Sequence, residues 1–403
     1  MSSGSQMIDL SGTPATFRFA ARVIVQNWRI GILTLVLPDG REMRLEGAVE
    51  GPEARLVIRD YRFINRVMGT GTIGFGEGYM AGEWDTPDLS RALEVLAANF
   101  AQFEGVSFGN PLMTAVNLLG HTLRGNTRWG SKRNIHAHYD LGNAFYARWL
   151  DPTMTYSAAR FSRPGEPLPD AQARKYRTLA QTMDLRAGHS VLEIGCGWGG
   201  FAEFAAREVG AKVTAITISE AQYMFAKERM FNLGLAEKAD IQLIDYRDVT
   251  GKFDRVASIE MFEAVGERFW STYFDKIRDS LAPGGRAGLQ IITIRDELFE
   301  HYKRTPDFIQ KYIFPGGMLP SEERLKVATD NAGLSWGPIS RFGVCYADTL
   351  AEWARRFEAA WEEITHLGFD ERFRKLWRFY LSYCEAGFRT ERTDVVQLSL
   401  VKA

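Results

Sequence analysis

The segment 190–219 constrains this chain more than any other, because it combines two apolar runs with a glycine-rich turn and a helical pattern. The run VLEI leads into the turn GCGWGG, a helical pattern follows to about Val209, and the β-rich run AKVTAITI comes next. A strand, a crossover helix and a second strand form a βαβ unit whose strands are parallel. The segment therefore predicts part of a parallel sheet that is covered by helices.

Three further apolar runs continue the alternation of strands and helices. They are DIQLI (240–244), FDRVASI (253–259) and GRAGLQIITI (285–294). This alternation predicts an α/β fold with a doubly wound, Rossmann-like sheet. Six aromatic residues recur at near-helical spacing after about Thr349, and we expect them in the core of helices packed on the sheet rather than in a ligand box: Trp353, Phe357, Trp361, Phe373, Trp377 and Tyr380.

The region before this sheet predicts a smaller second domain, because 403 residues fit two domains better than one core. Residues 30–46 place two apolar runs around a Pro-Asp-Gly turn, which is typical of a β-hairpin, and ARLVI (54–58) is a third strand candidate. A helical pattern over 89–100 follows, opened by Asp85 or Asp88. These elements predict a small α+β domain.

A basic segment separates the two predicted domains. Residues 121–138 break the apolar periodicity and place four cations around Trp129: Arg124, Arg128, Lys132 and Arg133. One interpretation is a solvated linker. The other is a contact with lipid headgroups, because cations that flank a Trp suit an anionic interface. With this linker, the predicted domains span 1–120 and 139–403.

The composition narrows the class of protein. With 45% hydrophobic and 25% charged residues the chain reads as globular, and its net charge of −1 excludes a global attraction to nucleic acid or to membranes. Its three cysteines are widely separated, so we expect neither disulfides nor a metal site, in keeping with a reducing cytoplasm. We also expect no signal peptide and no membrane-spanning segment. A membrane lipid would therefore be reached from outside the bilayer.

The glycine-rich turn is the strongest candidate binding site. Gly195 and Gly197 let backbone approach a ligand closely, and the following helix offers free N–H groups. The spacing is G-x-G-x-G-G after the strand residue Glu193, which differs from the G-x-G-x-x-G of dinucleotide sites. A tight turn without a ligand is the alternative. Cys196 lies in the turn, but no His is near it in sequence, so we interpret it as a small packing residue.

The second strand of the βαβ unit ends in another candidate segment. Ser219 and Gln222 have the spacing of a capping box for a helix that begins near Glu220. This placement leaves Thr217 and Gln222 at the carboxyl edge of a strand, where such folds bind ligands.

Together these motifs resemble the cyclopropane fatty acid synthases, which include the mycolic acid cyclopropane synthases. The matching segments are HYDLGN (138–143), DPTMTYS (151–157), LEIGCGWGGFAEFAA (192–206), ITISEAQ (216–222), DYRDV (245–249), MFEAVG (261–266), KYIFPGGMLPS (311–321) and YADTLAEWARRF (346–357). GFGEGYMAGEW (74–84) is similar to the N-terminal domain of the members that act on phospholipids. The resemblance covers nearly the whole chain in matching order. It implies the class I fold of methyltransferases that use S-adenosylmethionine (SAM), preceded by a lipid-binding domain.

The resemblance also implies which residues hold SAM. The implied contacts are Tyr156 and Ser157 at the methionine end, the loop of Gly195, Cys196 and Gly197 beneath it, Thr217 and Gln222 on the ribose side, and Tyr246 and Arg247 near the adenine. Many methyltransferases use an acidic residue for the ribose, whereas this family uses Thr and Gln.

The implied chemistry is addition of the SAM methyl group to a double bond, followed by loss of a proton from the resulting carbocation. In the family the proton acceptor is a bound bicarbonate, held by a Cys, a Glu, a His, a main-chain group and a Tyr. The matching Glu is Glu263, the main-chain group falls at Ile292 and the Tyr is Tyr346, whereas Ala158 replaces the Cys and Gln290 replaces the His. Ala158 offers no side-chain hydrogen bond and Gln290 never carries positive charge, so bicarbonate should be bound more weakly.

These replacements leave two products open. If Gln290 substitutes as a neutral donor, the product is a cyclopropane. If the base is lost, the cation is resolved by a hydride shift or by loss of another proton, and a methyl-branched or methylated unsaturated chain results. We favour the second product. The alternatives from other classes are a non-catalytic lipid-binding partner subunit and a small-molecule N- or O-methyltransferase.

The expected partners follow from the resemblance. We expect the unsaturated acyl chains of phospholipids as substrate, at the inner face of the cell membrane, and no nucleic acid. A homo-oligomer and a downstream reductase or desaturase stay open.

Overall fold

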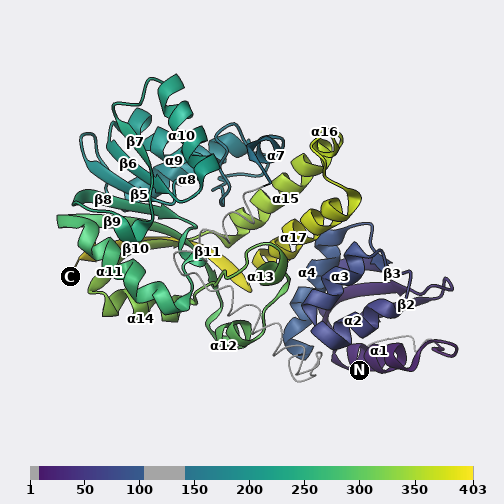
Figure 1. The fold of residues 1–403 in the computed structure, drawn as a ribbon. Helices are drawn as coiled ribbons and strands as arrows, with labels where there is room; N and C mark the ends of the chain where they lie inside the picture. Colours follow the sequence, from purple (N-terminus) through teal and green to yellow (C-terminus); the bar gives the residue numbers. More distant parts are fainter. Residues whose placement is uncertain (1–8, 104–140, 403) are drawn as a thin grey trace. The chain divides into compact units, whose positions relative to one another are not determined.

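The computed structural model describes residues 9–103 and 141–402, which form two compact units (Figure 1). Unit 1 combines residues 9–103 with two later segments, Arg304–Ile313 and Gly368–Glu391, and unit 2 holds the other described residues. The first unit is thus discontinuous in sequence. The predicted domains 1–120 and 139–403 did not include this discontinuity. The basic segment 121–138 lies outside the described residues.

Unit 2 is built on a seven-stranded sheet with helices on both faces (Figure 1). Its strands are β5 (Ser190–Ile194), β6 (Lys212–Thr217), β7 (Ala239–Leu243), β8 (Phe253–Ile259), β9 (Leu281–Ile294), β10 (Leu334–Arg341) and β11 (Thr393–Lys402). Its helices are α7 (Asn143–Ala147), α8 (Leu168–Thr182), α9 (Gly200–Phe204), α10 (Glu220–Asn232), α11 (Trp270–Ser280), α12 (Asp296–Arg304), α14 (Glu322–Asn331), α15 (Gly343–Ala359) and α16 (Trp361–Thr365).

The strand order is β10-β11-β9-β8-β5-β6-β7. Strands β9, β8, β5, β6 and β7 are parallel, β11 is antiparallel to β9, and β10 is antiparallel to β11. Val191 packs with residues of α8, α9 and α10, whereas the next residue, Leu192, packs with residues of α11 and α14. Strands buried on both faces are apolar throughout, which explains the unbroken runs of the sequence. The prediction of a doubly wound α/β sheet is confirmed.

Unit 1 is a four-stranded sheet covered by helices. Its elements are α1 (Ala15–Asn27), β1 (Ile30–Val36), β2 (Glu42–Glu46), β3 (Val49–Ile58), α2 (Arg62–Thr70), α3 (Thr72–Met80), β4 (Trp84–Asp85), α4 (Leu89–Asn99), α13 (Phe308–Tyr312) and α17 (Glu371–Arg389). The strand order is β2-β1-β3-β4, and β1 and β2 form the predicted hairpin. Asp88, and not Asp85, opens α4, because its carboxylate accepts a hydrogen bond from the backbone N–H of Arg91.

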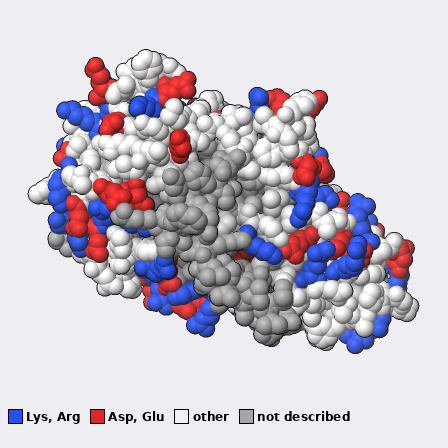
Figure 2. All heavy atoms as spheres, viewed as in Figure 1, with Lys and Arg blue, Asp and Glu red and all other residues white. Residues whose placement is uncertain are grey.

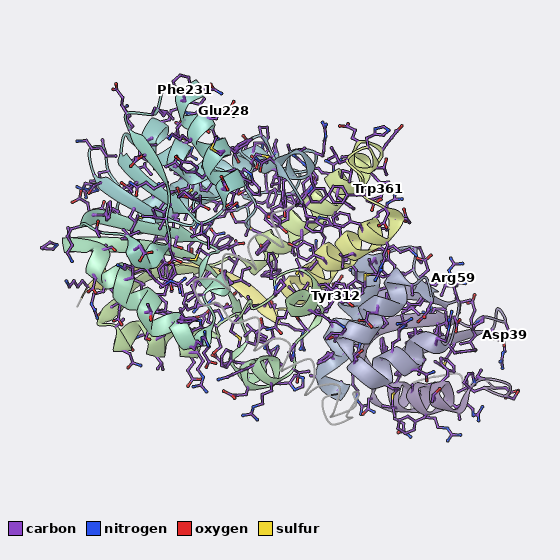
Figure 3. All side chains as sticks on the ribbon, in the orientation of Figure 1. Asp39, Arg59, Glu228, Phe231, Tyr312 and Trp361 are labelled. Atoms are coloured by element: carbon purple, nitrogen blue, oxygen red, sulfur yellow. The ribbon has the colours of Figure 1, made fainter. Side chains whose placement is uncertain are left out.

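The glycine-rich segment of unit 1 is helical, and its glycines allow close packing. A Cβ on Gly76 would lie 2.5 Å from the ring of Phe308, and one on Gly78 would lie 2.9 Å from Phe63. Glu77 between them accepts hydrogen bonds from Lys311 Nζ at 2.8 Å and from the Tyr312 hydroxyl at 2.5 Å (Tyr312 is labelled in Figure 3). The similarity motifs at 74–84 and 311–321 therefore meet at this glutamate, inside unit 1.

The C-terminal aromatic residues divide between the two units. Trp353 and Phe357 lie in α15 and are buried in unit 2, where α15 packs on β11. Trp377 and Tyr380 are also buried, but α17 belongs to unit 1 and packs on α4 and α3. The core role of these rings is confirmed, whereas the expectation that all these helices pack on the large sheet is wrong for α17.

The surface of the described residues is mixed in charge. Basic and acidic side chains are interspersed on the face drawn in Figure 2, in keeping with the net charge of −1. None of the helices in the described ranges is both long enough and apolar enough to cross a membrane.

Replacing Gly76 by Ala tests the close packing of α3. Its Cβ would lie 2.5 Å from the ring of Phe308 and 2.9 Å from that of Phe379, both buried, so overpacking should lower the free energy of unfolding by about 1–3 kcal/mol. The matched control is Gly69→Ala in α2, where nothing lies within 4 Å and the change should stabilise the helix by up to about 1 kcal/mol. Urea unfolding measures both, and equal effects would contradict the packing.

Candidate functional site

The carboxyl ends of the parallel strands gather the candidate residues at one edge of the sheet. Gly195 follows β5, Thr217 ends β6, Asp245 follows β7 and Glu260 follows β8, while Ile292 lies near the end of β9. Because β5 is the strand from which the chain order runs in both directions, this edge is the topological switch point, where open α/β sheets bind ligands.

The glycine-rich loop leaves space above β5. Gly195 has φ +81°, and a Cβ placed on it would meet the side chain of Met261 at 2.6 Å. The N–H groups of Gly195 and Cys196 donate to the carbonyl of Ile216 at 3.0 and 2.9 Å, which fixes the loop on β6. Gly197 has φ +53°, and nothing lies within 4 Å of the Cβ position. The loop is therefore held by the protein at Gly195 and open at Gly197.

Two buried groups lie under this loop. Burial raises the pKa of the Glu193 carboxyl to about 8, against the opposing charge of Lys175. Among the described residues, Oε2 of Glu193 has no hydrogen-bond partner, so a polar ligand group above β5 would be satisfied there. Burial also raises the pKa of the Cys196 thiol, which keeps it protonated, as suits a small packing residue.

Ser157 is held by α8 through two residues that the sequence did not single out. Lys175 Nζ donates to the Ser157 hydroxyl at 2.6 Å, and Gln172 Nε2 donates to the Ser157 carbonyl at 3.0 Å. Lys175 is fully buried, and burial lowers its pKa to about 7. The sequence signal for Lys175 was a lysine at an inward-facing position of an amphipathic helix. Tyr156 beside them is half-buried and lies against Trp353, with ring centroids 5.2 Å apart.

The implied ribose and adenine residues also lie at this edge. The Thr217 hydroxyl donates to Gln222 Oε1 at 2.9 Å, and both side chains are buried. Ser219 caps α10 as predicted, but the side chain of Gln222 pairs with Thr217 instead of completing a capping box.

After β7, a salt bridge defines the start of the next turn. Arg247 and Asp245 make two side-chain hydrogen bonds of 2.7 and 2.6 Å, and the guanidinium lies 5.3 Å from the ring of Tyr246. Burial raises the pKa of Tyr246 to about 12, so its hydroxyl stays neutral. The turn thus offers an aromatic face and a fixed cation.

Glu260 is the centre of a second cluster at this edge of the sheet, and the sequence did not identify it. Its Oε1 accepts hydrogen bonds from the backbone N–H of Ala158 at 2.8 Å and from Gln290 Nε2 at 2.7 Å. Its Oε2 accepts one from the Tyr346 hydroxyl at 2.7 Å. Three groups at positions that the resemblance assigns to the bicarbonate pocket therefore converge on a carboxylate of the chain itself.

Glu263 lies beside this cluster but has other partners. Its Oε1 accepts a hydrogen bond from the Ile292 N–H at 2.6 Å, while its Oε2 is buried without a partner in the described part of the chain. Burial and the neighbouring charge of Glu260 raise the pKa of Glu263 to about 8. Burial also raises the pKa of Glu260, but its three donors and the charge of Lys175 oppose that shift. With a pKa of about 8, Glu263 is mainly protonated at neutral pH, beside a Glu260 carboxyl whose oxygens accept three hydrogen bonds.

The backbone at Glu260 supports a functional role. Its φ of +50° is uncommon for a residue with a side chain and is maintained here by surrounding contacts, including the bond from its N–H to the Gln290 carbonyl at 2.8 Å. Two acids three residues apart, directly after a buried strand, were the available signal in the sequence SIEMFE. The resemblance pointed to the second acid alone.

Comparisons with known proteins agree with this geometry. Residues 127–398 match the family model for mycolic acid cyclopropane synthetase. The chain is 38% identical over 379 residues to the tuberculostearic acid methyltransferase UfaA1 of Mycobacterium tuberculosis, covering 92% of this chain and 88% of that protein. It is 34% identical over 348 residues to the cyclopropane-fatty-acyl-phospholipid synthase of Escherichia coli strain K12, covering 86% of this chain and 87% of that one.

A solved structure of the same kind matches about two thirds of the chain in fold. The mycolic acid cyclopropane synthase CmaA1, complexed with SAH and CTAB, aligns with a TM-score of 0.63 and 28% identity, covering 67% of this chain and 97% of that one. The comparisons confirm the SAM-methyltransferase fold, with SAM as the methyl donor.

Replacing Gly197 by Ala should lower SAM affinity at least tenfold. The new methyl group occupies the open space above β5, and the positive φ adds about 1–2 kcal/mol of strain. Gly188→Ala is the matched control, because Gly188 also has positive φ and open surroundings but precedes β5 at the opposite end of the strand. Titration calorimetry should show a loss for Gly197→Ala alone. Equal affinities for both variants would remove Gly197 from the binding site.

Proposed function

Because the chain belongs to the mycolic acid cyclopropane synthetase family, we propose that it transfers the methyl group of SAM to a double bond in an acyl chain of a membrane phospholipid. The direct product in this proposal is a methylated unsaturated chain and not a cyclopropane. The observation that carries it is the carboxylate of Glu260, which accepts the hydrogen bonds of Ala158, Gln290 and Tyr346. These three donors are therefore not available to bind an external bicarbonate.

The names of the relatives support the substrate class and differ about the product. One is named a tuberculostearic acid methyltransferase and the other a cyclopropane-fatty-acyl-phospholipid synthase, and each covers more than four fifths of this chain. The product must therefore be argued from the residues of this chain.

The first step needs an electrophile, a positioned alkene and a dry site. SAM, when bound, supplies a methyl group that bonds to one alkene carbon and leaves a cation on the other. Tyr346 and Trp353, buried and 6.2 Å apart between ring centroids, belong to an aromatic group that continues through Tyr156. Such faces stabilise a cation and exclude water.

Glu260 stabilises this cation from a fixed position. Both of its carboxylate oxygens accept hydrogen bonds, so the anion is preorganised and stabilises the cation by its charge before any proton is transferred. A longer-lived cation favours an intramolecular hydride shift, from the methyl-bearing carbon to the cationic carbon. The charge then lies on the more substituted carbon.

The last step returns the chain to neutrality. The new methyl group loses a proton to the Glu260 carboxylate, and the electron pair of that C–H bond becomes a carbon–carbon double bond. The raised pKa of Glu260 suits a proton acceptor. A saturated methyl branch would require a hydride from a separate reductase, which is the class of partner that would act next.

A cyclopropane remains the second candidate because part of the implied bicarbonate pocket is present. Glu263 and the Ile292 N–H face each other at 2.6 Å, and Oε2 of Glu263 has no partner among the described residues. In that case a bicarbonate held by these two groups would take the proton at ring closure, and Glu260 would only stabilise the cation.

Analysis of the reaction product distinguishes the methylated unsaturated chain from the cyclopropane. The protein is incubated with an unsaturated phosphatidylglycerol and SAM that carries a deuterated methyl group, and the extracted lipid is analysed by NMR and mass spectrometry. We expect vinylidene signals with two of the three deuterium atoms retained, because one is lost as the final proton. Cyclopropyl signals as the major component would contradict the proposed product.

Variants of two acids test the role of Glu260. Glu260→Gln keeps the shape of the side chain but removes the proton acceptor, so turnover should fall by about 100-fold or more while SAM affinity stays unchanged. Glu267→Gln, at an exposed ion pair with Lys303, is the control and should keep turnover within about twofold. Full turnover in Glu260→Gln would exclude Glu260 as the base.

A further inference from the structure

Helix α1 of unit 1 presents an outward stripe that is exposed in the described part of the chain. Ala15, Phe19, Arg22 and Gln26 are all exposed and recur at the spacing of one helix face. The opposite face, with Phe17, is buried in the unit. The helix is therefore docked through one side and free on the other.

The large apolar side chains that are exposed on unit 1 lie at or near this helix. Phe19 is 52% exposed and Val49 is 55% exposed, and they are the large apolar side chains left exposed in the described residues of unit 1. Val49 lies at the C-terminal end of α1, because its N–H donates to the carbonyl of Arg29 at 2.9 Å. Isolated exposed apolar residues are ordinary, but two at one helix of a small unit mark a surface.

The charged residues of α1 and of the turn that follows it are all basic. Helix α1 carries Arg18 and Arg22 and no acidic residue, and Arg29 follows it as another exposed cation. Neither Arg22 nor Arg29 pairs with a carboxylate in the described ranges, whereas Arg41, Arg44, Arg55, Arg59, Arg62, Arg66 and Arg91 of the same unit all form ion pairs. In Figure 2 the surface at the lower right, where Figure 1 places α1, shows uncharged and basic atoms.

We propose that this α1 surface, defined by Phe19, Arg22, Arg29 and Val49, docks unit 1 on a bilayer that contains anionic phospholipids. The proposal rests on the proposed function, because a phospholipid acyl chain must be reached from the membrane surface. Arginines at the headgroup level attract anionic lipid, and a Phe between them enters the interface. A stable folded partner needs about 800 Å² on each side, whereas a bilayer accepts a shallow stripe such as this one.

Vesicle binding of the full chain tests the charges. Arg22→Gln with Arg29→Gln should lower the partition coefficient on vesicles containing phosphatidylglycerol by about fivefold for each arginine, which corresponds to about 1 kcal/mol per basic residue near an anionic surface. The loss should shrink at high salt, because salt screens the attraction. Arg163→Gln with Arg177→Gln removes two exposed arginines of unit 2 as the control and should leave binding unchanged.

The apolar part is tested in the same assay. Phe19→Ala should weaken binding at low and high salt alike, whereas Phe231→Ala should not, although Phe231 is 74% exposed on α10 (Figure 3). Vesicle binding that is equal in the α1 variants and their controls would overturn the proposal. So would equal binding of the unchanged protein to neutral and anionic vesicles, which would favour an acidic protein partner.

Turnover in detergent micelles separates this proposal from the proposed function. The α1 variants should turn over micellar phospholipid at the rate of the unchanged protein and give the same product, because the methyl-transfer site is in unit 2. A cyclopropane product would contradict the proposed function, but it would leave the conclusion from vesicle binding unchanged. Micellar turnover lost along with vesicle binding would overturn the α1 surface, since a docking surface is not needed there.

Discussion

The candidate site depends on one half-buried carboxylate that three separate segments hold in place. Glu260 follows β8 and accepts hydrogen bonds from Ala158 before α8, from Gln290 in β9 and from Tyr346 in α15. Hydrogen bonds to a charged group contribute roughly 1.5–3 kcal/mol each, so removing the carboxylate leaves several polar groups unsatisfied at once. The same contacts connect the carboxyl edge of the sheet to the aromatic group of α15, and in the proposed function they determine where an alkene would meet the methyl donor.

Around this carboxylate the protein buries more ionisable groups than stability alone explains. Glu193 and Lys175 are buried at the strand edge and Glu260 and Glu263 are half-buried there, and desolvation shifts the pKa of each one toward its neutral form. Burying charge is costly unless it is paired, and clusters with shifted pKa values mark functional sites. Lys175 shows how the cost is reduced, because its ammonium donates to Ser157 and its charge opposes the shifts of Glu193 and Glu260. The cluster thus links the SAM end of the site to the acyl end.

The strands of the large sheet could be predicted because their burial on both faces produces long apolar runs, and FDRVASI coincides with β8. Helix α17 was expected to pack on the large sheet, but it packs on α4 and α3. Its aromatic pattern shows that one face is buried, but the pattern does not show which element covers that face. The implied SAM residues from Gly195 to Arg247 could be placed because they lie at or just after strand ends, whereas Tyr156 and Ser157 follow no strand and precede α8. Glu260 was missed because its role depends on three partners that are far away along the chain, and Lys175 because it is buried beneath a loop rather than exposed in a motif.

The central claim is that Glu260 takes the place of an external anion as proton acceptor, and the dependence of turnover on bicarbonate tests it most directly. The rate of methyl transfer is measured in buffer freed of carbon dioxide and again after addition of bicarbonate. If Glu260 is the base, turnover and product should be the same in both buffers. Turnover that falls in the depleted buffer and returns with bicarbonate would contradict the account, because the acceptor would then be the anion and not the carboxylate of the chain.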